Sequence, residues 1–122
     1  MIGYVTLGTN DLARAVAFYE QLLAPLGAKR VWHSERGVAW GTTPGGASLG
    51  VMMPFDGQPA TRGNGTMVAI AAGSREMVDR MHKLALELGG RDEGAAGPRG
   101  EGFYAGYFRD LDGNKLAAFC FG

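Results

Sequence analysis

Apolar positions along the chain follow two spacings, one typical of helices and one typical of strands. Behind Asn10 or Asp11, and again behind Ser74, apolar residues recur at every third or fourth position, which predicts two capped helices. The first helix should run to about Leu26 and the second to the Gly89-Gly90 pair, because glycine commonly ends a helix. Alternating apolar residues predict strands at 1–8, 28–34, 38–42, 47–53, 66–71, 103–109 and 115–121.

Two segments lack a clear period. Residues 55–65 contain Asp-Gly, Pro and Asn-Gly signals, so we expect them to connect two halves of the chain. Residues 91–102 are rich in glycine and charge, and we expect mostly loop there with a short strand at the start.

The order strand, helix, strands occurs twice. Tyr4 aligns with Met67 and Val5 with Val68 at one constant offset, and at a slightly larger offset Gly50 falls opposite Ala117. We therefore expect a single domain over 1–122, made of module one at about 1–57 and module two at about 64–122. Such a repeat implies that neither half closes a core alone.

Composition narrows the possible functions. Apolar residues make up 46% of the chain, charged residues 20%, and twelve basic residues balance twelve acidic ones. A neutral chain without a basic stripe is not expected to bind nucleic acid or a membrane surface. No apolar run is long enough to span a bilayer, the start does not resemble a signal peptide, and Cys120 is the only cysteine. We expect a cytoplasmic protein without disulfides.

Several sequence motifs together resemble those of a known family. They are Tyr4–Gly8, Asp11–Tyr19, Leu23–Gly27, Pro54–Gly57, Gly63–Gly65 and Arg109–Lys115. The chain resembles the vicinal oxygen chelate superfamily, which includes glyoxalases, bleomycin-resistance proteins and extradiol dioxygenases, and especially bacterial lactoylglutathione-lyase-like proteins. The resemblance implies an α+β fold of paired βαβββ modules, with two curled sheets around a cavity.

In the metal-dependent relatives, the resemblance implies ligands on the first and last strands of each module. Those positions carry Tyr4, Gly50, Met67 and Ala117 here. Divalent ions prefer imidazole nitrogen or carboxylate oxygen, so we expect no bound metal and no other cofactor. His33 and His82 are interpreted as surface or boundary histidines, because no carboxylate accompanies them at ligand spacing.

The same alignment predicts a ligand pocket on the sheet faces turned away from the helices. Tyr4 either packs as a core aromatic or lines this pocket, or it contacts the ligand directly. Trp32 and Trp40 are core or interface residues more often than ligand platforms. The inward face of strand 103–109 is not decided by the sequence, since both faces carry aromatic residues. The predicted pocket residues are Tyr4, Trp40, Gly50, Met52, Met67, Tyr104, Ala117 and Phe119.

Four functions remain open at this point. The favoured one is a superfamily protein of unassigned reaction that binds a small molecule in a metal-free cavity, with or without catalysis. The alternatives are a metal-dependent glyoxalase-type lyase or isomerase, a sequestering resistance protein, and an interaction domain whose cavity is filled. Many relatives pair across subunits, so we also expect a homodimer.

Overall fold

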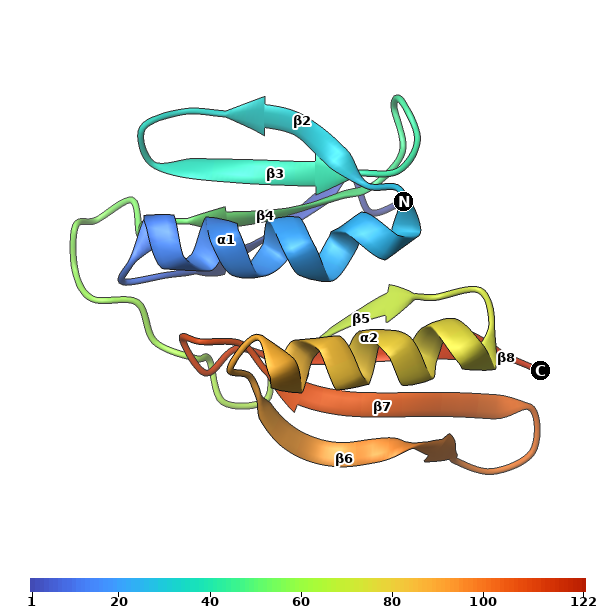
Figure 1. The fold of residues 1–122 in the computed structure, drawn as a ribbon. Helices are drawn as coiled ribbons and strands as arrows, with labels where there is room; N and C mark the ends of the chain where they lie inside the picture. Colours follow the sequence, from blue (N-terminus) through green and yellow to red (C-terminus); the bar gives the residue numbers. More distant parts are fainter. The chain divides into compact units, whose positions relative to one another are not determined.

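The computed structural model describes residues 1–122, which form two compact units, Met1–Thr61 and Arg62–Gly122. Each unit contains one α-helix and four strands in the order βαβββ (Figure 1). The predicted α+β class and the paired modules are therefore confirmed. No helix in the structure has the length and apolar character needed to cross a membrane.

Unit 1 is a mixed four-stranded sheet with one helix packed on it. The strand order is β1-β4-β3-β2, with β1 parallel to β4 and the other pairs antiparallel. Its elements are β1 (Tyr4–Gly8), α1 (Leu12–Leu23), a 3₁₀ turn (Ala24–Leu26), β2 (Lys29–His33), β3 (Gly37–Gly41) and β4 (Ser48–Met52).

The ends of α1 follow from local chemistry. Asp11 is the N-cap, and its carboxylate accepts a hydrogen bond from the Arg14 amide at 3.1 Å. Pro25 has no amide hydrogen to continue the α-helical ladder, and the last turn, predicted as α-helix, is a 3₁₀ turn instead. Gly27 then ends the helical segment as its C-cap, with a φ of 77°, a left-handed conformation that glycine adopts without strain.

The core of unit 1 lies between α1 and one face of its sheet. Tyr19 of α1 contacts Trp40 of β3, with ring centroids 5.9 Å apart. The alternation of side chains along each strand places Leu7, Val38 and Val51 on this same face. The buried residues of this core are Leu7, Ala15, Phe18, Tyr19, Leu22, Leu23, Val38, Trp40 and Val51.

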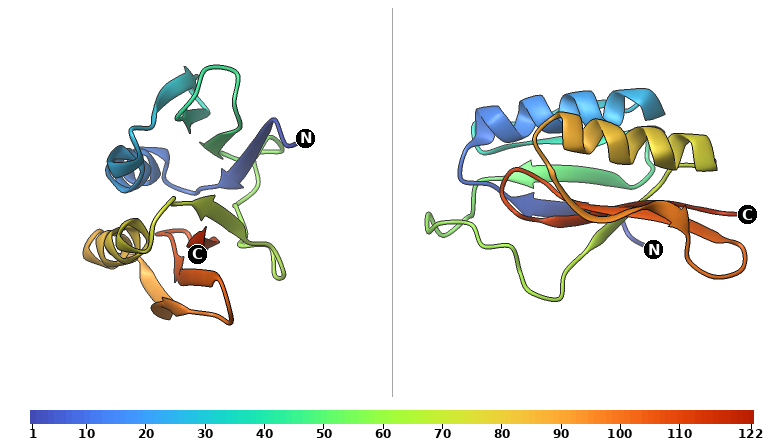
Figure 2. Two further views of the ribbon diagram at one scale, coloured as in Figure 1. Left: turned by 90° about the vertical axis from the view of Figure 1, so that its right-hand side faces the viewer. Right: turned by 60° about the horizontal axis from the view of Figure 1, so that its bottom comes forward.

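Unit 2 repeats this arrangement. Its strand order is β5-β8-β7-β6, and α2 packs on β6, β7 and β8; the left view of Figure 2 shows α2 end-on, beside the strands of its own unit. Its elements are β5 (Val68–Ala71), α2 (Arg75–Glu87), β6 (Arg91–Pro98), β7 (Phe103–Arg109) and β8 (Lys115–Phe121). Ser74 caps α2 as predicted, and the predicted bounds of β7 and β8 are confirmed.

The glycine-rich segment after α2 differs from the prediction. It forms an eight-residue strand, β6, rather than a short strand followed by loop. The pairing of β6 with β7 is interrupted by register shifts around Gly94, where φ is 157°. Bulges of this kind absorb residues with poor strand propensity, so the partner strand, not the local sequence, defines β6.

His82 lies under β6 rather than at the surface, which corrects the interpretation of this residue. The residue is 7% exposed, and its Nε2 lies 3.0 Å from an oxygen of Asp92. The same carboxylate oxygen accepts a hydrogen bond from the Gly94 amide at 2.8 Å. The Gly94 amide, followed by His82, lowers the pKa of Asp92 below its ordinary value. His82 therefore ties α2 to β6, whereas His33 is exposed on β2.

Strand register confirms the internal repeat. Thr6 pairs with Gly50 between β1 and β4, and Ala69 pairs with Ala117 between β5 and β8. In the sequence alignment of the two modules, Thr6 corresponds to Ala69 and Gly50 corresponds to Ala117, so the two pairs are equivalent. Gly50 and Ala117 therefore occupy corresponding places in their own sheets.

Candidate ligand-binding site

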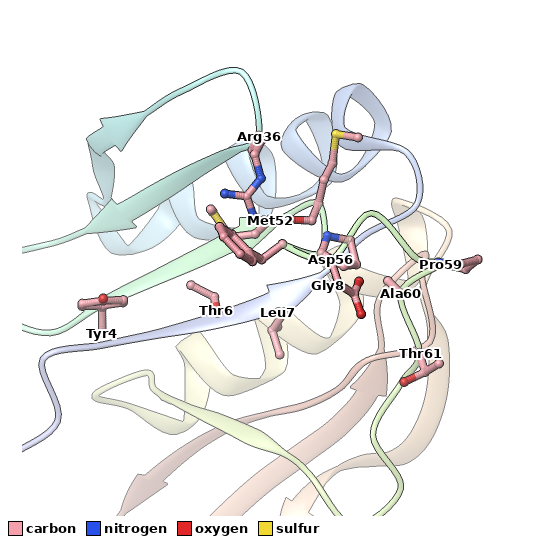
Figure 3. Close-up of a pocket in the computed structure, with 13 residues that line it drawn as sticks. Tyr4, Thr6, Leu7, Gly8, Arg36, Met52, Asp56, Pro59, Ala60 and Thr61 are labelled. Carbon is pink, nitrogen blue, oxygen red and sulfur yellow. Dashed lines mark hydrogen bonds between the residues drawn. The ribbon is translucent and has the colours of Figure 1, made fainter.

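The candidate site is built on the face of the unit 1 sheet that points away from α1. Figure 3 shows the side chains of Tyr4 and Thr6 on one side of β1 and that of Leu7 on the other. Leu7 is buried in the helix-facing core, so Tyr4 and Thr6 belong to the opposite face. Gly50 pairs with Thr6 and therefore shares this face.

We call the first hollow on this face the sheet pocket, and it has a volume of about 550 Å³. Strands β1, β3 and β4 form its floor, and β2 with the β2–β3 turn forms its rim. Its lining residues are Tyr4, Thr6, Val31, Trp32, Arg36, Ala39, Ser48, Gly50 and Met52.

A second hollow adjoins the first, and we call it the loop pocket (Figure 3). Its volume is about 560 Å³, and its outer wall is the segment 53–61 that follows β4. The two pockets share Tyr4, Thr6, Arg36 and Met52. These four residues therefore form the junction between the two hollows.

Two glycines shape the sheet pocket. A Cβ atom at Gly37 would lie 2.0 Å from the sulfur of Met52, so the thioether packs against Gly37 only because that residue has no side chain. At Gly50 an added Cβ would lie 3.4 Å from the Ala39 Cβ and 3.5 Å from a Thr6 methyl group, which is near ordinary contact distance. Gly50 therefore keeps the pocket floor low without being sterically required.

Arg36 is held at the junction by two contacts. One of its terminal nitrogens, Nη2, donates a hydrogen bond to the Met53 carbonyl at 3.0 Å. Its guanidinium carbon lies 5.2 Å from the centroid of the Phe55 ring, in cation–π geometry. The Met53 amide in turn donates to the Arg36 carbonyl at 2.7 Å, which fixes the backbone beneath the side chain.

Three of the residues predicted for a pocket lie together in the sheet pocket, namely Tyr4, Gly50 and Met52. Tyr4 is 73% exposed, so it does not fill a core as one interpretation of the sequence had it. Its ring instead forms part of the pocket wall, with its hydroxyl accessible to solvent or to a ligand.

Trp40 is not part of the sheet pocket, which corrects the prediction for this residue. It pairs with Leu49 on the helix-facing side of the sheet and is only 3% exposed. Its indole nitrogen donates a hydrogen bond to the Glu20 carboxylate of α1. That bond, with a further contribution from Arg30, lowers the pKa of Glu20. Trp40 is therefore a core residue that anchors α1 to the sheet.

Tyr104 also faces a helix rather than the open face of its sheet. Its hydroxyl donates a hydrogen bond to Asp79 of α2 at 2.6 Å, and this bond raises the pKa of Tyr104. The Arg75 guanidinium carbon lies 4.9 Å from the centroid of its ring. The face of β7 left open by the sequence is thus decided: Tyr104 and Phe108 point toward α2.

The remaining predicted residues belong to unit 2. Ala117 pairs with Ala69 and Tyr107, on the face of the sheet away from α2. Phe119 shares that face and packs against Phe103, with ring centroids 5.8 Å apart. Met67 precedes β5 and is exposed. Whether these residues of unit 2 contact a ligand stays a prediction.

Sequence reasoning missed three residues around the candidate site: Trp32, Arg36 and Phe55. Trp32 was favoured as a core or interface residue and left out of the predicted pocket, yet it is half exposed and lines the sheet pocket. Arg36 lies in the turn between β2 and β3, and Phe55 in the connector after β4, where no periodicity marks a facing direction. The one available signal was the pairing of β2 with β3 as a hairpin, which brings its turn beside the end of β4.

The residues at the family's metal positions do not fit a divalent ion. Around Tyr4 and Gly50, the neighbouring pocket side chains offer the hydroxyls of Thr6 and Ser48 and the thioether of Met52. In unit 2, the strand partners of Ala117 offer no imidazole or carboxylate. No three His, Cys, Asp or Glu side chains of the chain gather closely enough to hold a metal.

We therefore expect the purified protein to contain far less than one equivalent of zinc, nickel, iron or manganese. Elemental analysis after exhaustive dialysis measures this directly. A stoichiometric metal that survives dialysis would show that ligands other than those at the four family positions assemble in solution.

The chain is similar to a known sequence family and to several solved structures. Residues 1–118 match the sequence profile of the Glyoxalase/Bleomycin resistance protein/Dioxygenase superfamily. No curated protein matches the chain. Among solved structures, a glyoxalase/bleomycin resistance protein from Albidiferax ferrireducens T118 is 36% identical, with a TM-score of 0.87 over 98% of this chain and 97% of that one.

Two further structures share the fold at lower identity. The lactoylglutathione lyase of Agrobacterium tumefaciens is 21% identical, with a TM-score of 0.71 over 98% of this chain and 92% of that one. A family enzyme from Burkholderia phytofirmans PsJN is 19% identical, with a TM-score of 0.76 over 96% and 95% of the two chains. With the profile match across nearly its whole length, the chain belongs to the Glyoxalase/Bleomycin resistance protein/Dioxygenase superfamily.

Proposed function

We propose that the protein binds a small organic molecule in the sheet pocket of unit 1, without a metal ion. The observation that carries this proposal is the pocket itself, about 550 Å³ in volume and lined by apolar side chains with a few polar groups among them. Hollows of this size and lining are typical of small-molecule sites. The polar groups are the hydroxyls of Tyr4, Thr6 and Ser48 and the guanidinium of Arg36.

A metal-dependent lyase or isomerase reaction is not proposed. Such chemistry needs a Lewis acid to stabilise a developing negative charge, and the residues at the family's ligand positions lack the donors to hold one. Binding is the part of the function that the pocket supports.

A titration followed by amide NMR tests the proposal. Cinnamamide is a suitable neutral probe, because it has a flat apolar body and fits the pocket volume. We expect saturable shifts that report a single dissociation constant. Shifts that rise linearly with concentration and never saturate, for this probe and for its acid cinnamate, would contradict a small-molecule function at this site.

We also propose that the protein is a cytoplasmic homodimer. Exposed apolar side chains support the dimer, above all Trp32 of β2 and Phe121 at the end of β8. Trp40, which the sequence had suggested as part of such a surface, is buried and does not contribute. Light scattering at high micromolar concentration should give twice the mass of one chain, and a monomer mass would refute the dimer.

A further inference from the structure

We propose that the ligand of the sheet pocket is an organic anion, a carboxylate or similar acid on a flat apolar body, and that Arg36 binds its charge. This inference rests on the proposed small-molecule function and adds the chemical class of the ligand. Arg36 is the only charged residue among those that line the sheet pocket. A single cation in an otherwise neutral and largely apolar lining favours a ligand of opposite charge.

The guanidinium of Arg36 is held ready before a ligand arrives. Phe55 covers one of its faces, and the Met53 carbonyl takes one donor from Nη2. The remaining N–H groups lie in the plane of the guanidinium, where a carboxylate binds in a two-pronged fashion. Because the side chain is already anchored, binding an anion costs little additional conformational entropy.

Arg36 differs from the other arginines of unit 1 in having no acidic partner. Arg30 lies 3.1 Å from the Glu20 carboxylate, and Arg14 lies 4.0 Å from that of Asp11. Arg36 instead has only a neutral carbonyl and an aromatic ring as partners. Its charge is therefore not neutralised within unit 1, and an anionic ligand would neutralise it.

The charge of the two hollows decides which of them takes the anion. Asp56 lines the loop pocket, where its carboxylate accepts a hydrogen bond from the Gln58 amide at 2.9 Å. A second negative charge there would be repelled. The sheet pocket has no acidic residue, so we assign the anion to that side of Arg36.

The rest of the lining fits the flat apolar body. Trp32 and Tyr4 offer aromatic surfaces on which a ring can stack, and Val31 and Met52 add apolar contact. Gly50 and Ala39 have little or no side chain, so the floor of the pocket leaves room for the ligand body. An aryl or unsaturated acid would therefore place its body over the floor and its charge at the junction.

The test compares two probes of nearly equal shape, cinnamate and cinnamamide, by amide NMR titration. Wild-type protein should bind the acid about tenfold more tightly than the amide, since a hydrogen bond to a charged group contributes more than a neutral one. In Arg36→Gln the preference should disappear while binding of cinnamamide persists. Arg36→Lys should keep part of the preference, because it retains the charge but loses the planar fork.

Arg14→Gln is the matched control, since it removes the same charge from unit 1 outside either pocket, and it should keep the wild-type preference. Dispersed amide spectra of each variant confirm that it is folded. Equal affinity of wild-type protein for acid and amide would overturn the anion proposal and leave the small-molecule function standing. Failure of both probes to bind would instead contradict the small-molecule function itself.

Discussion

Replacing Gly50 with leucine is expected to abolish ligand binding while leaving the fold intact. The new side chain projects from the floor of the sheet pocket between Thr6 and Ala39 and occupies the space where a ligand would lie. Binding of cinnamate should weaken by about 100-fold or more, because the pocket volume is taken rather than merely reshaped. The amide NMR titration measures the loss.

The stability of Gly50→Leu should be at or slightly above that of the wild type. Glycine in a strand interior costs conformational entropy, and a Cβ at this position meets its neighbours near ordinary contact distance. Gly50→Ala should give a smaller loss of binding, and Gly3→Leu, where a Cβ meets nothing within 4 Å, should give none. Wild-type affinity in a folded Gly50→Leu protein would place the ligand elsewhere.

Phe108→Ala should destabilise the protein by about 3–5 kcal/mol, which is the usual cost of deleting a buried phenylalanine ring. Phe108 of β7 is 0% exposed and pairs with Leu116 of β8. Its ring packs edge-on against the His82 ring, with the two ring centroids 6.5 Å apart. The loss is a large share of the whole stability of a typical domain, which is about 5–15 kcal/mol. Urea unfolding followed by circular dichroism measures it.

Phe55→Ala is the matched control for this stability change. The same ring is removed, but Phe55 is 91% exposed, and its ring stacks on the Arg36 guanidinium. Its unfolding free energy should change by no more than about 0.5 kcal/mol. Similar losses for the two variants would mean that the core of unit 2 is not where β7 and α2 meet.

Elements bounded by strong local signals were predictable from the sequence. The N-cap signals at Asn10 or Asp11 and at Ser74 marked where the helices begin, and alternation predicted the bounds of β7 and β8. The repeat of the two modules placed Gly50 opposite Ala117, and these residues occupy corresponding places in their sheets. Strand β6 was predicted only at its start, because its glycines carry little strand propensity and pairing with β7 forms the rest.

The candidate site was predictable where alternation alone decides a facing direction. Tyr4 and Gly50 were placed on the open face by counting along β1 and β4. Trp40 was assigned to the open face of the sheet. Val38 lies two positions before it on the same strand and is buried, so alternation places both residues on the helix-facing side. Arg36 was missed because a turn residue has no alternation, and its position depends on which strand end lies beside the hairpin.

A crystal structure of the protein with cinnamate would locate the bound ligand directly. We expect the ring to lie over Gly50 in the sheet pocket and the carboxylate to lie within hydrogen-bond distance of the Arg36 guanidinium. Cinnamate bound instead on the aromatic cluster of Phe103, Phe119 and Phe121, with the sheet pocket empty, would contradict this placement.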